Sequence, residues 1–127
     1  MKGKRTTRTI RIFTDGAGKR PDGSGSGFAW IREDTGLRHI EHVNGLSNNE
    51  AEYRAVISAL KSVRPKSNVE ILTDSLLVVS QLHGEYRILD PKLTKLAGEV
   101  KTIAEQKHLD LKLTWITRKQ NLAGKLL

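Results

Sequence analysis

Apolar and polar residues alternate along three short stretches near the start of the chain. Residues 9–14 (TIRIFT) place Ile10 and Ile12 on one face, which is typical of a strand. After a glycine-rich loop, two further strands are predicted at residues 28–32 and 37–46, separated by a short turn. Links as short as these predict an antiparallel arrangement of the three strands.

A spacing of three and four residues replaces this alternation in the middle of the chain. Within residues 49–61, Val56, Ala59 and Leu60 form one apolar stripe, which predicts a helix packed on a core. The remaining predicted elements are strands at residues 69–73 and 109–115 and helices at residues 76–84, 91–107 and 121–127.

The order of these elements, β-β-β-α-β-α-α-β-α, predicts an α/β fold. Strands connected through a helix are normally parallel, with a right-handed crossover. We therefore expect one mixed sheet in which the first, fourth and fifth strands are parallel and the antiparallel hairpin strands lie on one side.

The net charge of the chain indicates what kind of partner it binds. The chain has 127 residues, a formal net charge of +8 and no cysteine. The positive charge favours an anionic partner, nucleic acid before membrane, although a basic solvated surface explains it equally well. His39 and His42 are three apart in a predicted strand, so they point to opposite faces and cannot share a metal.

Three carboxylates are predicted to converge. Asp15 and Asp74 each follow a predicted strand, and the carboxyl ends of parallel strands share one edge of the sheet. Glu52 lies on the inward face of the helix at 49–61, whereas Glu50 lies on its outward face with Arg54, where the two can form an ion pair. Each residue alone has an ordinary explanation as a turn, cap or boundary residue. Together they predict an oxygen-only site suited to Mg²⁺ or Mn²⁺.

The motifs FTDGAG (residues 13–18), SNNEAEY (residues 47–53) and LTDS (residues 72–75) occur in this order within the predicted elements. With these three motifs in this order, and with these elements between them, the chain resembles the type 1 ribonuclease H family from about residue 9 to its end. The resemblance implies a mixed five-stranded sheet in the order 3-2-1-4-5, with strand 2 antiparallel, flanked by helices. It also implies an endonuclease that hydrolyses the RNA strand of RNA–DNA hybrids with two Mg²⁺ (or Mn²⁺) ions.

The resemblance also assigns residues to roles. Asp15, Glu52 and Asp74 match the family's catalytic, metal-binding carboxylates, and the backbone of Gly16 matches a position beside the metal. The residues expected to contact the substrate are Asn48, Asn49 and Ser75, together with Arg118 as the candidate for handling phosphate. A plain surface role explains Arg118 equally well. Asparagine amides can both donate to and accept from a ribose 2′-hydroxyl, the group that distinguishes RNA from DNA.

The chain departs from the family in three places. The basic protrusion of some bacterial members is replaced by a short segment, residues 83–92, so we expect hybrid affinity to come from the basic N-terminus and the helix at 91–107. The loop TRKQN (residues 117–121) lacks a histidine and resembles a shorter, arginine-containing version. The family's fourth carboxylate position falls on Lys125, which could place an ammonium near the attacking water or the scissile phosphate but would also repel a nearby cation. The expected functional substitute is Asn121, with helix capping as the alternative role of that residue.

These departures leave alternatives open. A hybrid-binding module with weakened catalysis is the second hypothesis, and a resolvase- or transposase-like core is a third, disfavoured by the asparagine pair and the compact length. We further expect a single domain over residues 1–127 with a basic tail at 1–8 and a short last helix. A monomer in the cytoplasm, without a signal peptide or membrane span, completes the expectation.

Overall fold

The computed structural model describes residues 8–127, so all but the last residue of the expected basic tail at 1–8 lies outside the described residues. The strands are β1 (Thr9–Ala17), β2 (Gly27–Arg32), β3 (Arg38–His42), β4 (Asn68–Thr73) and β5 (Asp110–Trp115). The α-helices are α1 (Asn48–Ser62), α2 (Leu76–Leu82) and α3 (Pro91–Gln106), and two short 3₁₀ helices, η1 (Arg118–Gln120) and η2 (Leu122–Leu126), close the chain.

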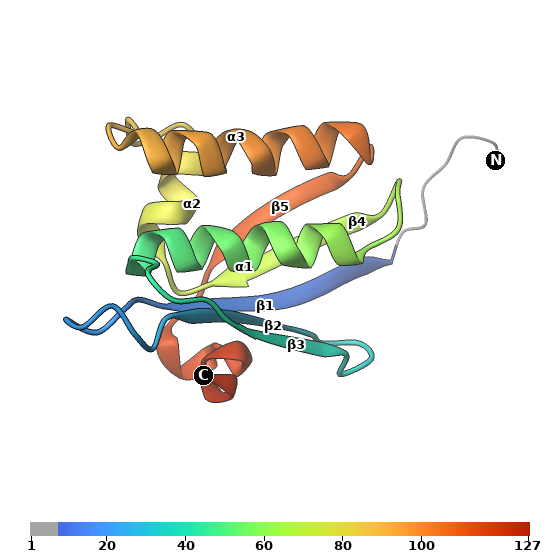
Figure 1. Cartoon of the computed structure of the whole chain (residues 1–127). Coiled ribbons are helices and arrows are strands. Elements are labelled where there is room, and N and C mark those ends of the chain that lie inside the picture. The colour runs from blue at the N-terminus through green and yellow to red at the C-terminus, as the bar shows by residue number, and fades with distance from the viewer. Residues whose placement is uncertain (1–7) are drawn as a thin grey trace, which may run out of the picture.

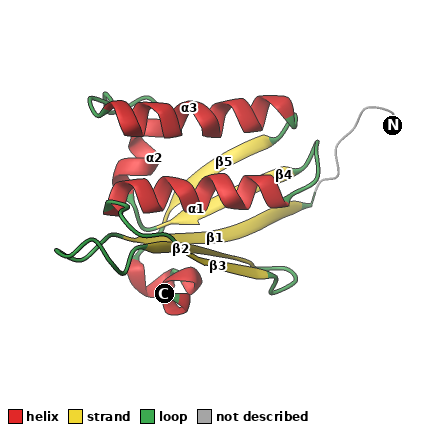
Figure 2. Ribbon diagram, viewed as in Figure 1, coloured by secondary structure: helices red, strands yellow, loops and turns green. Residues whose placement is uncertain are grey.

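The five strands form one sheet in the order β3-β2-β1-β4-β5 (Figure 1). β2 is antiparallel to both neighbours, whereas β1, β4 and β5 are parallel. This arrangement confirms the fold class and strand order predicted above. The α-helices lie on one side of the sheet, and the 3₁₀ helices lie on the other side, below β1 and β2 (Figure 2). No helix within residues 8–127 is long and apolar enough to cross a membrane.

Three predicted elements differ from the structure, two in where they end and one in its helix type. β1 continues past Asp15, because its antiparallel pairing with β2 extends to Ala17, although its parallel pairing with β4 ends at Phe13. β3 ends at His42 rather than at residue 46, because Val43 already donates to the backbone of Ser26 outside the ladder. The helix predicted at residues 121–127 is the 3₁₀ helix η2.

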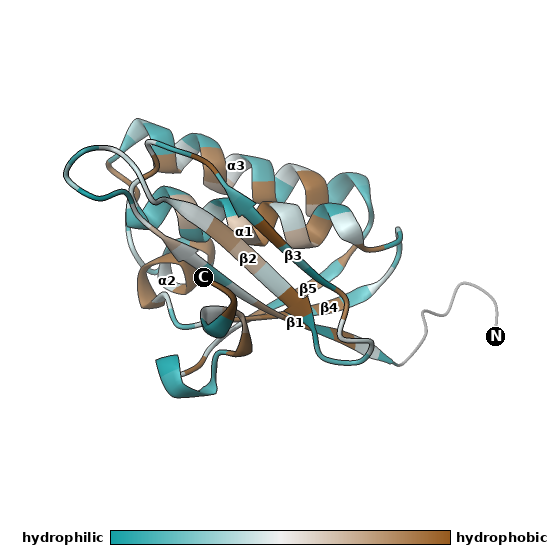
Figure 3. Ribbon diagram, turned by 60° about the horizontal axis from the view of Figure 1, so that its bottom comes forward, coloured by the Kyte–Doolittle hydropathy of each residue, from teal (hydrophilic) through white to brown (hydrophobic). Residues whose placement is uncertain are grey.

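The main core lies between the sheet and the helices α1 and α3. Ile12 and Ile71 of the central strands meet Val56 and Leu60 of α1 there, and all four side chains are fully buried. Figure 3 shows the resulting separation, with brown stretches along the strands and mostly teal residues in the loops. Because α1 is packed so tightly against β1, the residues at its N-terminal end are held close to the end of that strand.

The C-terminal end of α1 is capped by the lysine that follows α3. The ammonium of Lys107, which directly follows α3, donates to the carbonyl oxygens of Leu60, Lys61 and Val63 at 2.7–3.0 Å. These are among the carbonyls that a helix end leaves without intrahelical partners. A positive charge also interacts favourably with the negative end of the helix dipole. One side chain therefore joins the ends of the two long helices.

Replacing Lys107 by methionine should lower the free energy of unfolding by about 1–3 kcal/mol, because three carbonyls at the end of α1, two of them partly buried, lose a charged donor. Urea denaturation measures this loss. Lys101→Met is the matched control, since Lys101 is an exposed residue of the same helix. Equal stability of the two variants would show that the triple contact contributes nothing.

Candidate active site

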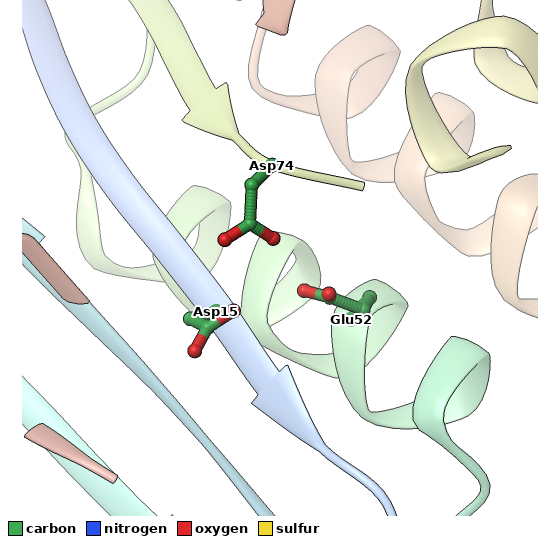
Figure 4. Close-up of side chains that lie close together, drawn as sticks. All are labelled: Asp15, Glu52 and Asp74. Atoms are coloured by element: carbon green, nitrogen blue, oxygen red, sulfur yellow. The ribbon is translucent and has the colours of Figure 1, made fainter. Parts of the chain in front are cut away.

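The three predicted carboxylates meet at one edge of the sheet. Asp15 comes from β1, Glu52 from α1 and Asp74 from the residue after β4 (Figure 4). One carboxylate oxygen from each lies within 4.8 Å of the other two. The structure thus brings together the three residues that the sequence analysis singled out.

The register of the parallel strands explains why the two aspartates are neighbours. The last paired residues of β1 and β4 are Phe13 and Leu72, and each aspartate lies two positions beyond its own member of that pair. The backbone around Asp74 is held on both sides. Ser75 N–H donates to the hydroxyl of Thr73 at 3.0 Å, and the indole N–H of Trp115 donates to the Asp74 carbonyl at 3.2 Å.

Glu52 is brought to the same point by the close approach of α1 to β1. A Cβ on Gly16 would lie 2.4 Å from the backbone of both Ala51 and Glu52, so only glycine allows this contact. The residue therefore has a packing role in addition to the backbone position that the resemblance assigns to it. Since Gly16 directly follows Asp15, the contact sets the distance between the two carboxylates.

Glu50 and Glu52 have the different roles that their helical phase predicts. Glu50 accepts from the backbone of Ser47 at 3.0 Å while its own N–H donates to the Ser47 hydroxyl, a capping box at the start of α1. The predicted Glu50–Arg54 ion pair is wrong, because the Arg54 guanidinium lies over the ring of Phe28, 5.9 Å from its centre. Glu50 thus stabilises the helix that presents Glu52.

The three carboxyl groups interact strongly with one another. Burial raises the pKa of Glu52 to about 9, and the charges of Asp15 and Asp74 add to this shift. Burial raises the pKa of Asp15 to about 6, again with a contribution from Asp74. The Gly16 backbone N–H and the positive charge of Arg118 act in the opposite direction on both groups. The ionised forms of Glu52 and Asp15 are therefore unfavourable here in the absence of an added positive charge.

The donor set fits a hard divalent cation. All three groups offer oxygen ligands, which Mg²⁺ and Mn²⁺ prefer. In addition, the Oε1 atom of Glu52 is buried and has no hydrogen-bond partner within residues 8–127. A buried carboxylate oxygen without a partner is costly, and a bound cation would remove that cost.

The carboxylates form one wall of a pocket of about 800 Å³. The η1 and η2 segments supply another part of the lining, which carries the positive side chains of Arg118, Lys119 and Lys125. Of the other predicted site residues, Gly16, Asn48 and Asn121 also line the pocket. The sequence analysis missed Lys119, although the basic run beside Arg118 was a visible signal.

Two predicted substrate residues are not among the described residues that line this pocket. Asn49 lies in the first turn of α1, next to Asn48. The hydroxyl of Ser75 accepts from Val78 N–H at 3.2 Å and caps α2. The expected contacts of both residues with a substrate stay predictions.

Asn121 is 1% exposed, and both ends of its amide are engaged. Its Nδ2 donates to the carbonyl of Thr14 at 2.9 Å, and its Oδ1 accepts from Ala123 N–H at 3.1 Å. The second contact caps η2. These bonds anchor the C-terminal segment to β1, and they favour the capping alternative over a ligand role for this residue.

The family model for RNase H matches residues 7–123 of the chain. The chain belongs to the RNase H family. This membership confirms the resemblance drawn from the three motifs, and RNase H folds are also found among similar solved structures. The crystal structure of LC11-RNase H1 in complex with RNA/DNA hybrid has a TM-score of 0.79 at 27% identity, covering 93% of this chain and 92% of that one.

The chain covers a smaller share of its curated relatives than of this solved structure. A Ribonuclease H of Polynucleobacter asymbioticus is 43% identical over 70 residues, which cover 54% of this chain and 46% of that protein. The uncharacterized protein YpeP of Bacillus subtilis is 30% identical over 121 residues, covering 88% of this chain and 54% of that protein. The chain thus spans about half the length of these curated relatives.

The raised pKa of Glu52 predicts how the stability of this RNase H domain depends on pH. Without divalent cations the folded state holds the Glu52 proton up to about pH 9, whereas an ordinary glutamate loses it near 4.5. The folded state therefore binds more protons in this interval, and Glu52 makes the protein less stable as the pH rises through it. Glu52→Gln removes the group that is deprotonated, and with it this loss of stability. The melting temperature of Glu52→Gln should therefore exceed that of the wild type by an amount that grows between about pH 5 and pH 9.

Thermal melts in EDTA measure this difference, and repeating them with Mg²⁺ supplies the control. A cation bound to the folded wild type stabilises it, so Mg²⁺ should reduce or reverse the advantage of Glu52→Gln. A difference in melting temperature that does not change with pH would contradict the assigned proton affinity.

The contacts of Asn121 predict that Asn121→Ala and Asn121→Asp both lower the melting temperature in EDTA. Alanine loses both hydrogen bonds, and aspartate places a carboxylate against the Thr14 carbonyl. Each should cost about 1–3 kcal/mol, the range for a broken buried hydrogen bond. If instead Asn121→Ala melts like the wild type and only the metal dependence of cleavage changes, the ligand role expected from the sequence is correct.

Proposed function

We propose that this chain is a metal-dependent endonuclease that hydrolyses the RNA strand of RNA–DNA hybrids. The observation that carries the proposal is the convergence of Asp15, Glu52 and Asp74 in a pocket that also carries basic side chains, with one Glu52 oxygen that has no hydrogen-bond partner among the described residues. Membership of the RNase H family supports it. The relative named Ribonuclease H and the RNA/DNA hybrid in the LC11-RNase H1 complex add support for this activity and substrate.

In this proposal the carboxylates of Asp15, Glu52 and Asp74, with the adjacent Gly16 backbone, hold Mg²⁺ or Mn²⁺, two ions in the catalytic complex. Bound divalent cations supply the positive charge that favours deprotonation of the attacking water and stabilises the leaving oxygen. The oxygen of water forms a new bond to phosphorus as the bond from phosphorus to the 3′ oxygen breaks. The products are a 3′-hydroxyl and a 5′-phosphate.

The basic wall of the pocket, formed by η1 and η2, suits the phosphate of the substrate. Arg118 is the main candidate for this contact, because its charge reaches both Asp15 and Glu52. Lys119 and Lys125 extend the positive surface along the same wall. A phosphodiester between the two walls would meet opposite charge on the basic side and metal-bound carboxylates on the other.

The asparagines at the start of α1 and Ser75 are assigned to the sugar and groove edges of the hybrid. Asn48 lines the pocket, and Asn49 follows it in the same helical turn. The 2′-hydroxyl is the group through which such contacts distinguish RNA from DNA. The monomeric state and cytoplasmic location expected from the sequence stay predictions.

A catalytically weakened hybrid-binding module is the second candidate. The observation in its favour is that residues 111–127 contain neither Asp nor Glu, so the wall formed by η1 and η2 offers no fourth carboxylate. Incubating the protein with labelled hybrid, duplex RNA and duplex DNA, in Mg²⁺, Mn²⁺ or EDTA, separates the two. Hybrid cleavage that requires a divalent cation supports the nuclease, and tight binding without cleavage supports the module.

Asp74→Asn should lower the rate of hybrid cleavage by at least about a hundredfold, the scale expected when a charged group at the reacting centre is lost. Hybrid binding, measured by fluorescence anisotropy, should be largely retained because the basic wall is intact. Glu50→Gln is the matched control, since glutamine also completes a capping box. Near wild-type cleavage by Asp74→Asn would show that the site assignment is wrong.

A further inference from the structure

A hydrogen-bonded polar pair lies in the apolar core between α1 and α2. The hydroxyl of Tyr53, on α1, donates to the Oε1 of Gln81, on α2, at 2.7 Å. Tyr53 is fully buried and Gln81 is 6% exposed, and the cluster around Tyr53 includes Ile12 and Val78. Because a polar group in such surroundings needs a partner, the bond determines how the two side chains meet.

Each partner of this bond is close in the chain to one of the carboxylates. Tyr53 directly follows Glu52. Gln81 belongs to α2, whose first residue comes two positions after Asp74. α2 contacts α1 and lies beside its first turns (Figure 1). The bond therefore connects the helix that carries Glu52 to the helix that begins immediately after Asp74.

The position of α2 depends on its contacts with the rest of the protein. The helix has seven residues, and a helix this short is not stable by itself in water. Val78 and Val79 are buried, but apolar contacts have no preferred direction and allow a helix to slide or turn. A hydrogen bond is directional, so the bond to Gln81 fixes where α2 lies along α1.

A shift of α2 is passed directly to Asp74. This residue lies between Thr73, the last residue of β4, and Ser75, the N-cap of α2. On the strand side the backbone is fixed by the pairing of β4 with β5. On the helix side it is fixed by the position of α2. A displaced α2 therefore changes the distance of the Asp74 carboxylate from those of Asp15 and Glu52.

We propose that Tyr53 and Gln81 are positioning residues, whose hydrogen bond sets the spacing of Glu52 and Asp74 for binding a divalent cation. The inference rests on the proposed function and extends it from the carboxylates to a pair in the core. Neither side chain is among the described residues that line the pocket, so both act through the helices that carry them. Polar contacts that orient ligands from outside a metal site can change its affinity as much as the ligands do.

Three variants remove the bond with little change in side-chain volume. Tyr53→Phe leaves the Gln81 carbonyl oxygen without its donor, and Gln81→Met leaves the Tyr53 hydroxyl without its acceptor. Each single variant should therefore be less stable to urea than the wild type. The double variant replaces both polar partners by apolar groups, so it should recover most of the lost stability.

The affinity for Mn²⁺ separates a positioning role from a structural one. It is measured from the electron paramagnetic resonance signal of free Mn²⁺ as the protein is titrated. Since all three variants lack the bond, each should bind Mn²⁺ about tenfold more weakly than the wild type. The double variant should thus regain stability without regaining affinity. Wild-type affinity in the double variant would overturn the inference, because the bond would then contribute to stability alone.

Ser58→Ala is the matched control, because it removes another hydrogen bond between α1 and a neighbouring element. The indole N–H of Trp30, on β2, donates to the Ser58 hydroxyl at 2.9 Å. This bond does not involve α2. Ser58→Ala should therefore lower the stability to urea and leave the affinity for Mn²⁺ unchanged. An equal loss of affinity in Ser58→Ala would show that any weakening of α1 affects the carboxylates, which would overturn the inference.

Amide hydrogen exchange reports on α2 without any cation. The N–H groups of Val79 and His83 donate to the carbonyls of Ser75 and Val79, so they report on the hydrogen bonds of this helix. In the double variant they should exchange faster than in the wild type, whereas the amides of β4 should keep their protection. Unchanged protection throughout α2 would show that its position does not depend on the bond, which would also overturn the inference.

The wild-type protein distinguishes a failure of this inference from a failure of the proposed function. A wild type that neither binds Mn²⁺ nor cleaves labelled RNA–DNA hybrid overturns the proposed function, and this inference with it. Hybrid cleavage by the wild type, together with wild-type Mn²⁺ affinity in all three variants, overturns this inference alone.

Discussion

The parallel pairing of β1 with β4 is the constraint on which the rest of the site depends. It fixes Phe13 opposite Leu72, and the two aspartates follow at equal distances from that pair. No movement of a loop is needed to bring them together, because the shared register of β1 and β4 already places them side by side. The third carboxylate is added by a helix that glycine allows to pack directly on β1. The register of the sheet and the glycine at position 16 thus determine the spacing of the three carboxylates.

The clustering of three carboxyl groups lowers the stability of the folded protein. Burial and mutual repulsion raise the pKa values of Glu52 and Asp15, so their ionised forms are unfavourable in the folded protein. The surrounding structure compensates with well-satisfied contacts nearby. The capping box of α1 and the bonds on either side of Asp74 hold the three groups in place. A site of this kind lowers the stability of the protein in exchange for the close approach of three acidic side chains.

The sequence predicted the fold and the three carboxylates because both depend on regular patterns. Alternation and helical spacing determine the elements, and short links and crossovers determine the strand order. The predictions that failed depend on contacts between distant residues. The length of β1 is set by its pairing with β2. The last segment is a 3₁₀ helix that begins after Asn121, a residue whose side chain is bonded to Ala123 and to the distant Thr14. Likewise, Arg54 packs on Phe28 rather than pairing with Glu50, a choice that helical phase alone does not reveal.

The bond between Asn121 and Thr14 joins residues 107 positions apart in the chain. The basic wall of the pocket is therefore attached to the carboxylate wall by one of the most non-local contacts in the domain. Segments joined in this way open at a lower cost than the sheet on which they dock, because few buried residues hold them. Opening of η1 and η2 leaves the carboxylates in register but removes the positive side of the pocket. The domain can thus lose its complete pocket while its sheet and its three carboxylates stay in place, so the carboxylate cluster and the intact pocket report on different degrees of folding.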